Sequence, residues 1–219
     1  MGLNMKIVDE KTIQWMGGDA YRIARYISNL ETTLSVDGNI IIPKSSLNEI
    51  KRVLETTDDD VKIFFDSNTF QVFTDHIKFK TRLIESEFPN LDRVMNNSGP
   101  ITMGIDRKHL LNAVKVLHQV SDDSANSVVK LTLLEGTLQI ESQKMEFGEG
   151  MDEIPCDYVG EEMKIGVNTK FFIDALLAFE GTKDDLILMN FTTPVSPIGF
   201  TVEGWESFKT VLMPVKITW

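Results

Sequence analysis

The sequence contains few of the residues that build disulfides or metal sites. One cysteine, Cys156, occurs among 219 residues, so the chain can form neither an intrachain disulfide nor a thiolate cluster for zinc. The three histidines, His76, His109 and His118, do not have metal-ligand spacing. We interpret Cys156 as a half-buried thiol of a protein in a reducing compartment, and we expect neither a metal ion nor a cofactor.

Long apolar runs and catalytic motifs are also missing. No stretch approaches the roughly 20 apolar residues that cross a bilayer, and the opening MGLNMKIVDE lacks the basic, hydrophobic and small-residue pattern of a signal peptide. The sequence has no G-x-G-x-x-G, Walker-type, H-E-x-x-H or G-x-S-x-G motif. We therefore predict a cytoplasmic protein that is not an enzyme.

Positive charge is scarce as well. The chain has 22 basic and 33 acidic residues and a formal net charge of -11. Taken alone, this balance argues against binding to nucleic acid, because neutralising phosphates requires Lys and Arg. A protein can nevertheless be acidic on one face and basic on another, so the distribution of charge decides. The hydrophobic content of 42% is that of a folded protein with a real core.

Three stretches of the chain share one plan. They run from Asn39 to Glu85, from Pro100 to Gln143 and from Glu161 to Gly204, and each reads as a strand, a short amphipathic helix, an acidic turn and three strands. The acidic turns are Asp58–Asp60, Asp122-Asp123 and Asp184-Asp185. Liganding loops alternate their donors, whereas consecutive carboxylates point in different directions, so we interpret these residues as turns and not as a metal site.

Hydrophobic spacing supports the helices and strands of this plan. Leu47, Ile50 and Leu54 predict a buried face on a helix that begins near Ser45. Similar spacing of apolar residues predicts a helix in the second stretch. Alternation of apolar and polar residues predicts strands, and the tight turn at Glu135-Gly136 separates two of them. The residues with helical spacing in the second stretch are Leu110, Val114 and Leu117, and those with alternation in the first are Val61, Ile63 and Phe65.

The repeated β-α-β-β-β unit predicts the domain organisation. A unit of about 45 residues buries too little apolar surface to be stable alone, so units should pair around shared cores. The second and third units form a complete domain over residues 99–219, whereas the first unit, with the strand-like residues before it, leaves an incomplete domain over residues 1–98. We predict an α+β fold with helices on one face of antiparallel sheets.

Four short segments resemble one family, the bacterial DNA sliding clamps, which are the beta subunit of the replicative DNA polymerase III holoenzyme. GGDAYRIA resembles the family's A-T-D-G-H-R-L-A segment, and IIIPKSSLNEIKRVL resembles V-I-V-P-R-K-x-L-x-E-L. RLIESEFPNLDRVM resembles the connector L-I-x-G-x-F-P-D-Y-x-R-V, and VLMPVKI resembles the terminal V-I-M-P-M-R-L. The resemblance extends over essentially the whole chain but corresponds to the C-terminal part of a clamp only.

The resemblance implies a DNA-clamp fold and a function in replication. Clamps close into rings with helices around the hole, encircle double-stranded DNA without sequence specificity, and tether DNA polymerase subunits, the clamp loader and repair proteins through short peptide motifs. They act as processivity factors and form homo-oligomers. By this resemblance, the family's first domain and the opening strand and helix of its second domain have no counterpart in this sequence. An alternative therefore stays open, namely a shortened clamp-like protein that binds partner peptides and regulates the full clamp without encircling DNA.

The resemblance also implies two sets of site residues. Family members receive partner peptides in a hydrophobic cleft, which carries over to Tyr21, Arg22, Ile23, Pro89, Arg93, Val94, Val211, Met213, Pro214, Val215 and Lys216. Tyr21 replaces the family's histidine, Lys216 replaces an arginine, and Thr218-Trp219 extend past the usual end. The basic residues expected to face DNA are Lys44, Lys51, Arg52, Arg107, Lys108, Lys115 and Lys170.

Overall fold

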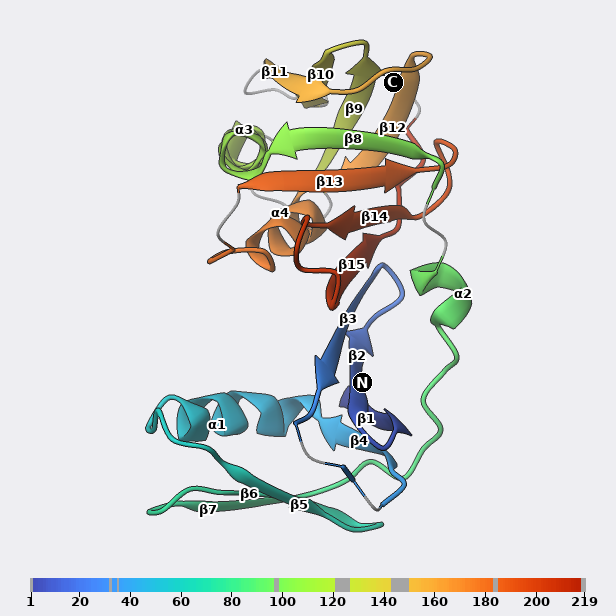
Figure 1. The fold of residues 1–219 in the computed structure, drawn as a ribbon. Coiled ribbons are helices and arrows are strands. Elements are labelled where there is room, and N and C mark those ends of the chain that lie inside the picture. The colour runs from blue at the N-terminus through green and yellow to red at the C-terminus, as the bar shows by residue number, and fades with distance from the viewer. Residues whose placement is uncertain are drawn as a thin grey trace. The chain divides into compact units, whose positions relative to one another are not determined.

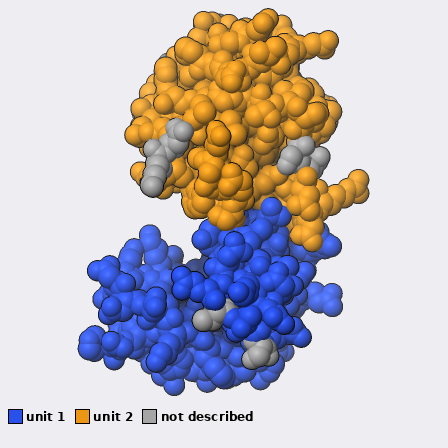
Figure 2. Space-filling model, viewed as in Figure 1, with its two compact units in different colours: residues 1–19, 24–90 blue, residues 20–23, 91–219 orange. Residues whose placement is uncertain are grey.

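The computed structural model describes residues 2–31, 33–34, 36–96, 99–120, 127–142, 150–182 and 185–217. The chain divides into two compact units (Figure 2). Unit 1 comprises residues 1–19 and 24–90, and unit 2 comprises residues 20–23 and 91–219. The predicted domain boundary after residue 98 lies next to residues outside the described ranges and stays a prediction.

The described residues of unit 1 form strands and one helix (Figure 1). Its strands form a run in the order β3-β2-β1-β4 and a separate sheet in the order β5-β6-β7. Strand β3 begins with two residues that belong to unit 2. The elements are β1 (Gly2–Asp9), β2 (Thr12–Gly18), β3 (Arg22–Asn29), β4 (Asn39–Pro43), α1 (Lys44–Leu54), β5 (Lys62–Phe65), β6 (Thr69–Phe73) and β7 (Lys78–Arg82).

Unit 2 contains strands in the order β12-β9-β10-β11-β8-β13-β14-β15, and helices α3 and α4 lie side by side against them (Figure 1). Its elements are α2 (Asp92–Met95), β8 (Ile101–Asp106), α3 (Arg107–Val120), β9 (Val128–Leu134), β10 (Thr137–Ser142), β11 (Met151–Asp157), β12 (Met163–Asn168), α4 (Thr169–Leu177), β13 (Leu186–Phe191), β14 (Ile198–Thr201) and β15 (Phe208–Leu212).

The order of the elements confirms the repeated unit. β4-α1-β5-β6-β7, β8-α3-β9-β10-β11 and β12-α4-β13-β14-β15 each follow the β-α-β-β-β plan. The predicted turn at Gly136 joins β9 to β10, and Gly136 has a φ of 74°, which a residue without a Cβ adopts readily. The pairings between neighbouring strands are antiparallel, so the predicted α+β class is confirmed.

The predicted helix faces are confirmed in part. Leu110, Val114 and Leu117 of α3 are buried in the core of unit 2, as their spacing predicts. In α1, by contrast, Val53 is buried and Leu54 is 42% exposed, so the prediction for Leu54 is wrong. Successive side chains of an α-helix lie about 100° apart around its axis. Val53 therefore points toward the core, and its neighbour Leu54 lies at the edge of the apolar stripe.

The predicted alternation in strand β5 also fails at one residue. Val61 and Phe65 pack against the core of unit 1, but Ile63 is 47% exposed. Among the described residues, β5 pairs with β6 alone and therefore lies at a sheet edge, where one side of the strand is uncovered.

Of the helices that the structure describes, none is long and apolar enough to span a membrane.

Candidate functional site

The last described segment of the chain changes from core to surface within a few residues. In β15, Val211 and Leu212 are buried, with exposed fractions of 2% and 0%. Met213, Pro214 and Val215 are half-buried, and Lys216 is exposed. The segment therefore closes the core of unit 2 with β15 and offers apolar side chains at its surface immediately afterwards. The expected contribution of Thr218-Trp219 lies outside the described residues.

Two backbone hydrogen bonds hold this surface segment in place. The Met213 N–H donates to the Tyr21 carbonyl at 2.7 Å, and the Val215 N–H donates to the Gly166 carbonyl at 2.8 Å. Gly166 lies in β12 and forms an isolated antiparallel bridge with Val215. A Cβ at Gly166 would lie 2.4 Å from both the Val215 carbonyl oxygen and Cγ2 of Ile217. The close approach of the terminal segment to β12 therefore requires glycine at this position.

Residues 20–23 are held by the first turns of α4. The Tyr21 ring is stacked on the Phe171 ring with centroids 5.4 Å apart. The Arg22 guanidinium lies over the same Phe171 ring at 4.6 Å and forms an ion pair with Asp174. Phe171 and Asp174 are three residues apart in one helix, so they face the same side. Tyr21 nevertheless remains 56% exposed.

The start of α4 is fixed by its own cap. The Asn168 side chain accepts a hydrogen bond from the Phe171 N–H at 3.1 Å, which satisfies one of the unpaired donors of the first turn. This cap fixes the residue at which α4 begins and therefore the direction in which the Phe171 side chain projects from the helix. The stacking of Tyr21 and Arg22 on Phe171 therefore depends on the helix start as well as on the aromatic ring.

Helix α2 adds further predicted residues to the same unit. It contacts β15, and its last residue, Met95, is fully buried. Val94 is half-buried and Arg93 is exposed. Apart from Pro89, which is an exposed residue of unit 1, all predicted cleft residues belong to unit 2. The membership of Pro89 in the site stays a prediction.

Sequence reasoning missed three residues of this arrangement. Phe171, Asp174 and Gly166 support Tyr21, Arg22 and the terminal segment, but no local pattern marks them. The ion pair between Arg22 and Asp174 joins residues 152 positions apart, and spacing rules describe neighbours along one element only. The paired aromatics at the start of α4 were visible in the sequence, but their partner on residues 20–23 was not.

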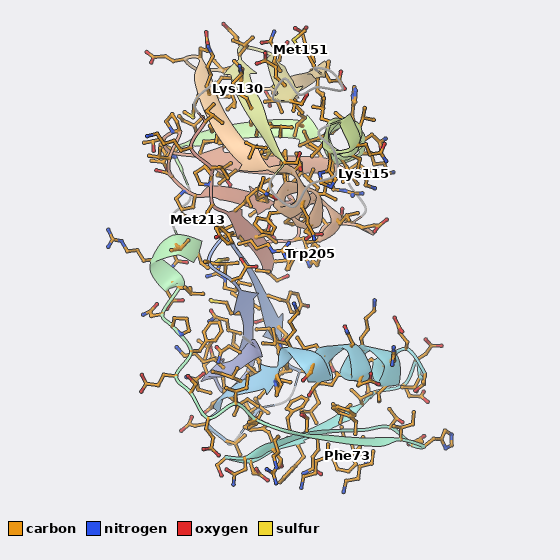
Figure 3. The ribbon with its side chains drawn as sticks, turned by 180° about the vertical axis from the view of Figure 1, so that it is seen from behind. Phe73, Lys115, Lys130, Met151, Trp205 and Met213 are labelled. Carbon is orange, nitrogen blue, oxygen red and sulfur yellow. The ribbon has the colours of Figure 1, made fainter. Side chains whose placement is uncertain are left out.

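The basic residues predicted to face DNA differ in exposure. Lys44, Lys51, Arg52, Lys108, Lys115 and Lys170 are exposed. Figure 3 shows Lys115 on α3 and Met213 on the terminal segment, on different elements of the chain. Lys51 and Arg52 pair along α1 with Glu55 at 3.6 Å and Glu49 at 2.9 Å. Such exposed pairs contribute little stability, and the assignment of these residues to a DNA-facing surface stays a prediction.

Arg107 does not lie on an exposed helix side, and the prediction for its position is wrong. Its side chain is 5% exposed, and its guanidinium donates to a carboxylate oxygen of Asp185 at 3.0 Å. The Lys108 ammonium binds the other oxygen at 2.6 Å. These hydrogen bonds, from Lys108 first and then Arg107, hold the pKa of Asp185 below its usual range. Asp185, from the third acidic turn, thus anchors the start of α3.

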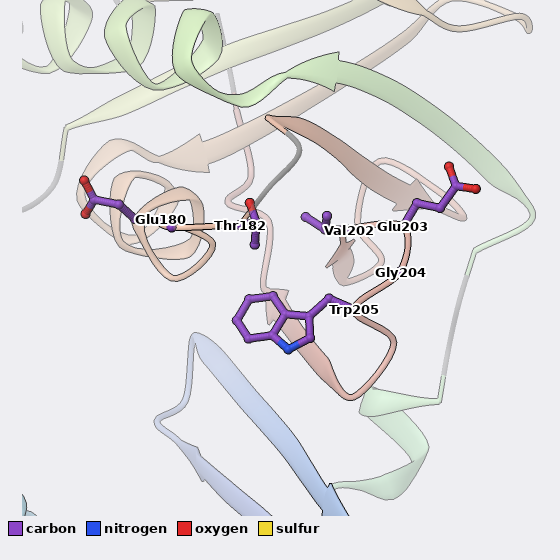
Figure 4. Close-up of a pocket in the computed structure, with 7 residues that line it drawn as sticks. Glu180, Thr182, Val202, Glu203, Gly204 and Trp205 are labelled. Carbon is purple, nitrogen blue, oxygen red and sulfur yellow. The ribbon is translucent and has the colours of Figure 1, made fainter. Parts of the chain in front are cut away.

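A separate pocket of unit 2 has no predicted site residue in its wall. It has a volume of about 430 Å³ and lies beside the end of α4 and the turn after β14 (Figure 4). Its lining consists of Glu180, Gly181, Thr182, Val202, Glu203, Gly204 and Trp205. The Trp205 ring packs on Phe179 and Phe208, with centroid distances of 6.0 and 4.8 Å, so this wall belongs to the core.

Comparison with known proteins identifies the family. The repeated units and their sheet order define a DNA-clamp fold. Residues 93–216 match the model for the C-terminal domain of the DNA polymerase III beta subunit, and residues 1–90 match the model for its central domain. The chain belongs to the DNA polymerase III beta subunit family.

Individual relatives agree with this assignment. The beta sliding clamp of Staphylococcus aureus is 25% identical over 211 residues, which are 96% of this chain and 55% of that protein. The DNA polymerase III beta chain of Streptococcus pneumoniae is 26% identical, with a TM-score of 0.89 over 99% of this chain and 57% of that chain. The chain therefore spans about half the length of the curated relatives it matches.

A third relative is a structure of a sliding clamp from Bartonella birtlesii, described as bound to griselimycin. It has a TM-score of 0.89 over 99% of this chain and 58% of that chain. Its sequence identity is 21%, so this likeness concerns the fold alone.

Proposed function

We propose that the chain acts in DNA replication as part of a sliding clamp, which tethers DNA polymerase and repair proteins to double-stranded DNA. Partner proteins bind through short peptides that enter a site built around Tyr21, Arg22, Ile23 and residues 211–216. Arg93 and Val94 border this site, and Pro89 is included on the resemblance to the family alone. The protein acts as a tether and not as an enzyme, so its activity consists of binding.

One observation carries this proposal. Residues 20–23, the first turns of α4 and the segment after β15 come together, although they are far apart in the sequence. The arrangement presents half-buried Met213, Pro214 and Val215 beside an exposed tyrosine. Flexible methionine and rigid proline suit a site that accepts several apolar peptides, and a few charged groups at the rim of such a surface fix the orientation of a peptide.

Two further observations support the proposal. The clamp of Bartonella birtlesii is described as bound to griselimycin, so a clamp of the same fold binds a small ligand. In addition, helices α1, α3 and α4 carry exposed lysines on a chain with a net charge of -11. Lysines on helix surfaces can attract phosphates without reading bases, as sliding along a duplex requires. The family match favours this function over the alternative of a regulator that never encircles DNA.

Titration with a labelled peptide tests the proposed site. The chain is titrated with a fluorescent peptide that contains a Q-L-x-L-F sequence, and unlabelled griselimycin is added as a competitor. We expect saturable binding, a loss of about tenfold or more in affinity for Met213→Ala with Pro214→Ala, and unchanged binding for the control Met151→Ala. Met151 is 63% exposed on β11, so it matches Met213 in chemistry but not in position. Absence of binding by the folded wild-type chain would refute the proposal.

A further inference from the structure

One face of the sheet β5-β6-β7 gathers positive charge on a chain that is acidic overall. Side chains alternate between the two faces of a strand, so Lys78, Lys80 and Arg82 of β7 project from the same face. Lys62 of β5 lies on this face too, because it pairs through β6 with Lys78. All four basic side chains are exposed. Residues 61–84 contain these four and only two acidic residues, whereas the whole chain has a net charge of -11.

The opposite face of the sheet belongs to the core of unit 1. Phe70 and Val72 of β6 are buried there in one cluster with Val53 of α1. The basic face is therefore turned away from α1, and it is separate from the basic residues expected to face DNA on that helix. Figure 3 shows Phe73 on β6, in the sheet that lies across from α1.

Aromatic rings lie among the basic side chains on this face. Phe64 of β5 is 53% exposed, and it pairs with Gln71, which pairs in turn with Lys80. The Lys78 ammonium lies 5.1 Å from the centroid of the half-buried Phe73 ring. Rings that are surrounded by cations and reached by solvent offer a stacking surface for a planar, negatively charged ligand.

The corresponding sheet of the third repeat shows that the fold does not require this charge. Strands β13, β14 and β15 hold the same place in their repeat as β5, β6 and β7. They contain one basic residue, Lys209, which is only 6% exposed. The four basic residues of the first repeat therefore need an explanation other than the folding of the sheet.

Neighbouring carboxylates do not neutralise the basic face. Within the described part of the chain, none of its four basic residues forms an ion pair. Asp66 lies at the end of β5, but its carboxylate accepts hydrogen bonds from the N–H groups of Asn68 and Thr69 and so stabilises the turn to β6. Four like charges on one small face repel one another, and an anionic ligand would remove this repulsion.

We propose that this face binds single-stranded DNA. Lys78, Lys80 and Arg82 are two residues apart along an extended strand, so successive side chains start about 6.6 Å apart and can each meet a phosphate. Phe64 and Phe73 supply surfaces on which bases stack, as in proteins that bind single strands without reading their sequence. A duplex keeps its bases stacked inside and cannot use these rings. The inference goes beyond the proposed function and depends neither on the peptide site nor on the helices.

Fluorescence anisotropy with a labelled oligothymidylate of about 16 nucleotides tests this inference. We expect saturable binding to the wild-type chain, and a loss of about tenfold or more in affinity for Lys78→Gln with Lys80→Gln. Because each phosphate contact contributes about 0.7 to the slope for single strands, the slope of log K against log salt concentration should shrink by about 1.4. Phe64→Ala should lower affinity by about fivefold or more without changing the slope, since it removes stacking and no charge.

The matched control is Lys6→Gln with Lys11→Gln. Both lysines are exposed in unit 1 and lie outside the sheet β5-β6-β7. The same change in net charge should therefore leave affinity within about twofold of the wild type and the slope unchanged. Circular dichroism verifies that all variants are folded before the comparison.

Other results would overturn the proposal. Equal losses in the two double variants would mean that net charge alone matters, and a loss only in Lys51→Gln with Arg52→Gln would place binding on α1. Tighter binding of a duplex of the same length would exclude stacking on the rings, and tighter binding of oligouridylate would assign the face to RNA. Binding to vesicles of phosphatidylglycerol but not to the oligonucleotide would assign it to a membrane. Absence of binding by the folded chain would mean that these lysines only keep the sheet edges from pairing.

Discussion

A single methyl group at Gly166 is predicted to displace the terminal segment of the proposed peptide site without disturbing the core. In Gly166→Ala, the added Cβ would begin 2.4 Å from the Val215 carbonyl oxygen and 2.4 Å from Cγ2 of Ile217, where ordinary contact begins at about 3.4 Å. The terminal segment therefore has to move away from β12 by roughly 1 Å. The other edge of β12 is paired with β9 through Gly166↔Lys130, and that pairing is unaffected.

The size of the effect follows from the hydrogen bond that is lost. The Val215 N–H lies 2.8 Å from the Gly166 carbonyl oxygen, and a displacement of this size lengthens the distance beyond hydrogen-bonding range. The net loss is about 1 kcal/mol of stability. If the displaced segment forms one wall of the peptide site, affinity for the labelled peptide should fall by about fivefold to tenfold. The midpoint of thermal unfolding should change by only a few degrees.

Matched variants make this prediction decisive. Gly199→Ala is the control, because a Cβ at Gly199 in β14 would meet its nearest neighbour, Cε of Lys209, at 3.5 Å. Val215→Pro removes the same donor without adding an atom at position 166, so it should reproduce the loss of affinity. The reasoning is refuted when Gly166→Ala and Gly199→Ala bind the peptide with equal affinity.

Three further predictions follow from the contacts of unit 2. Phe171→Ala should weaken peptide binding by about 0.5–1.5 kcal/mol, because Tyr21 loses its stacking partner, whereas Phe171→Tyr should bind like the wild type; isothermal titration measures both. Lys115→Glu should reduce retention of an assembled clamp on DNA more than the matched change Lys164→Glu on β12, as measured by dissociation from circular DNA at low salt, and equal effects would contradict a role for α3. The pKa of Asp185 is lowered in the folded state. Its ion pairs therefore add to the free energy of unfolding above the ordinary pKa of about 4, and this contribution is lost as the pH falls through the lowered value. Asp185→Asn should remove this pH-dependent contribution in urea titrations at several pH values, and an unchanged pH profile would contradict the prediction.

Patterns within single elements allowed much of the fold to be predicted. Leu110, Val114 and Leu117 recur with the period of a helix, and the period alone places them on one side of α3. The prediction failed where an element reaches the edge of a packed surface. Leu54 and Ile63 have the spacing of core residues, but the structure describes nothing that covers them, because spacing specifies a face and not its partner.

The candidate site shows the same division between sequence and tertiary structure. The sequence by itself determined the repeated unit, the family resemblance and the apolar character of the segment from Val211 to Val215, since these are properties of neighbouring residues. Only the tertiary structure decided that Phe171 supports Tyr21 and that Asp185 binds Arg107, which removed Arg107 from the exposed basic residues. Such contacts join residues distant in the sequence, and their geometry is fixed by the packing of whole elements and not by the local period of the chain.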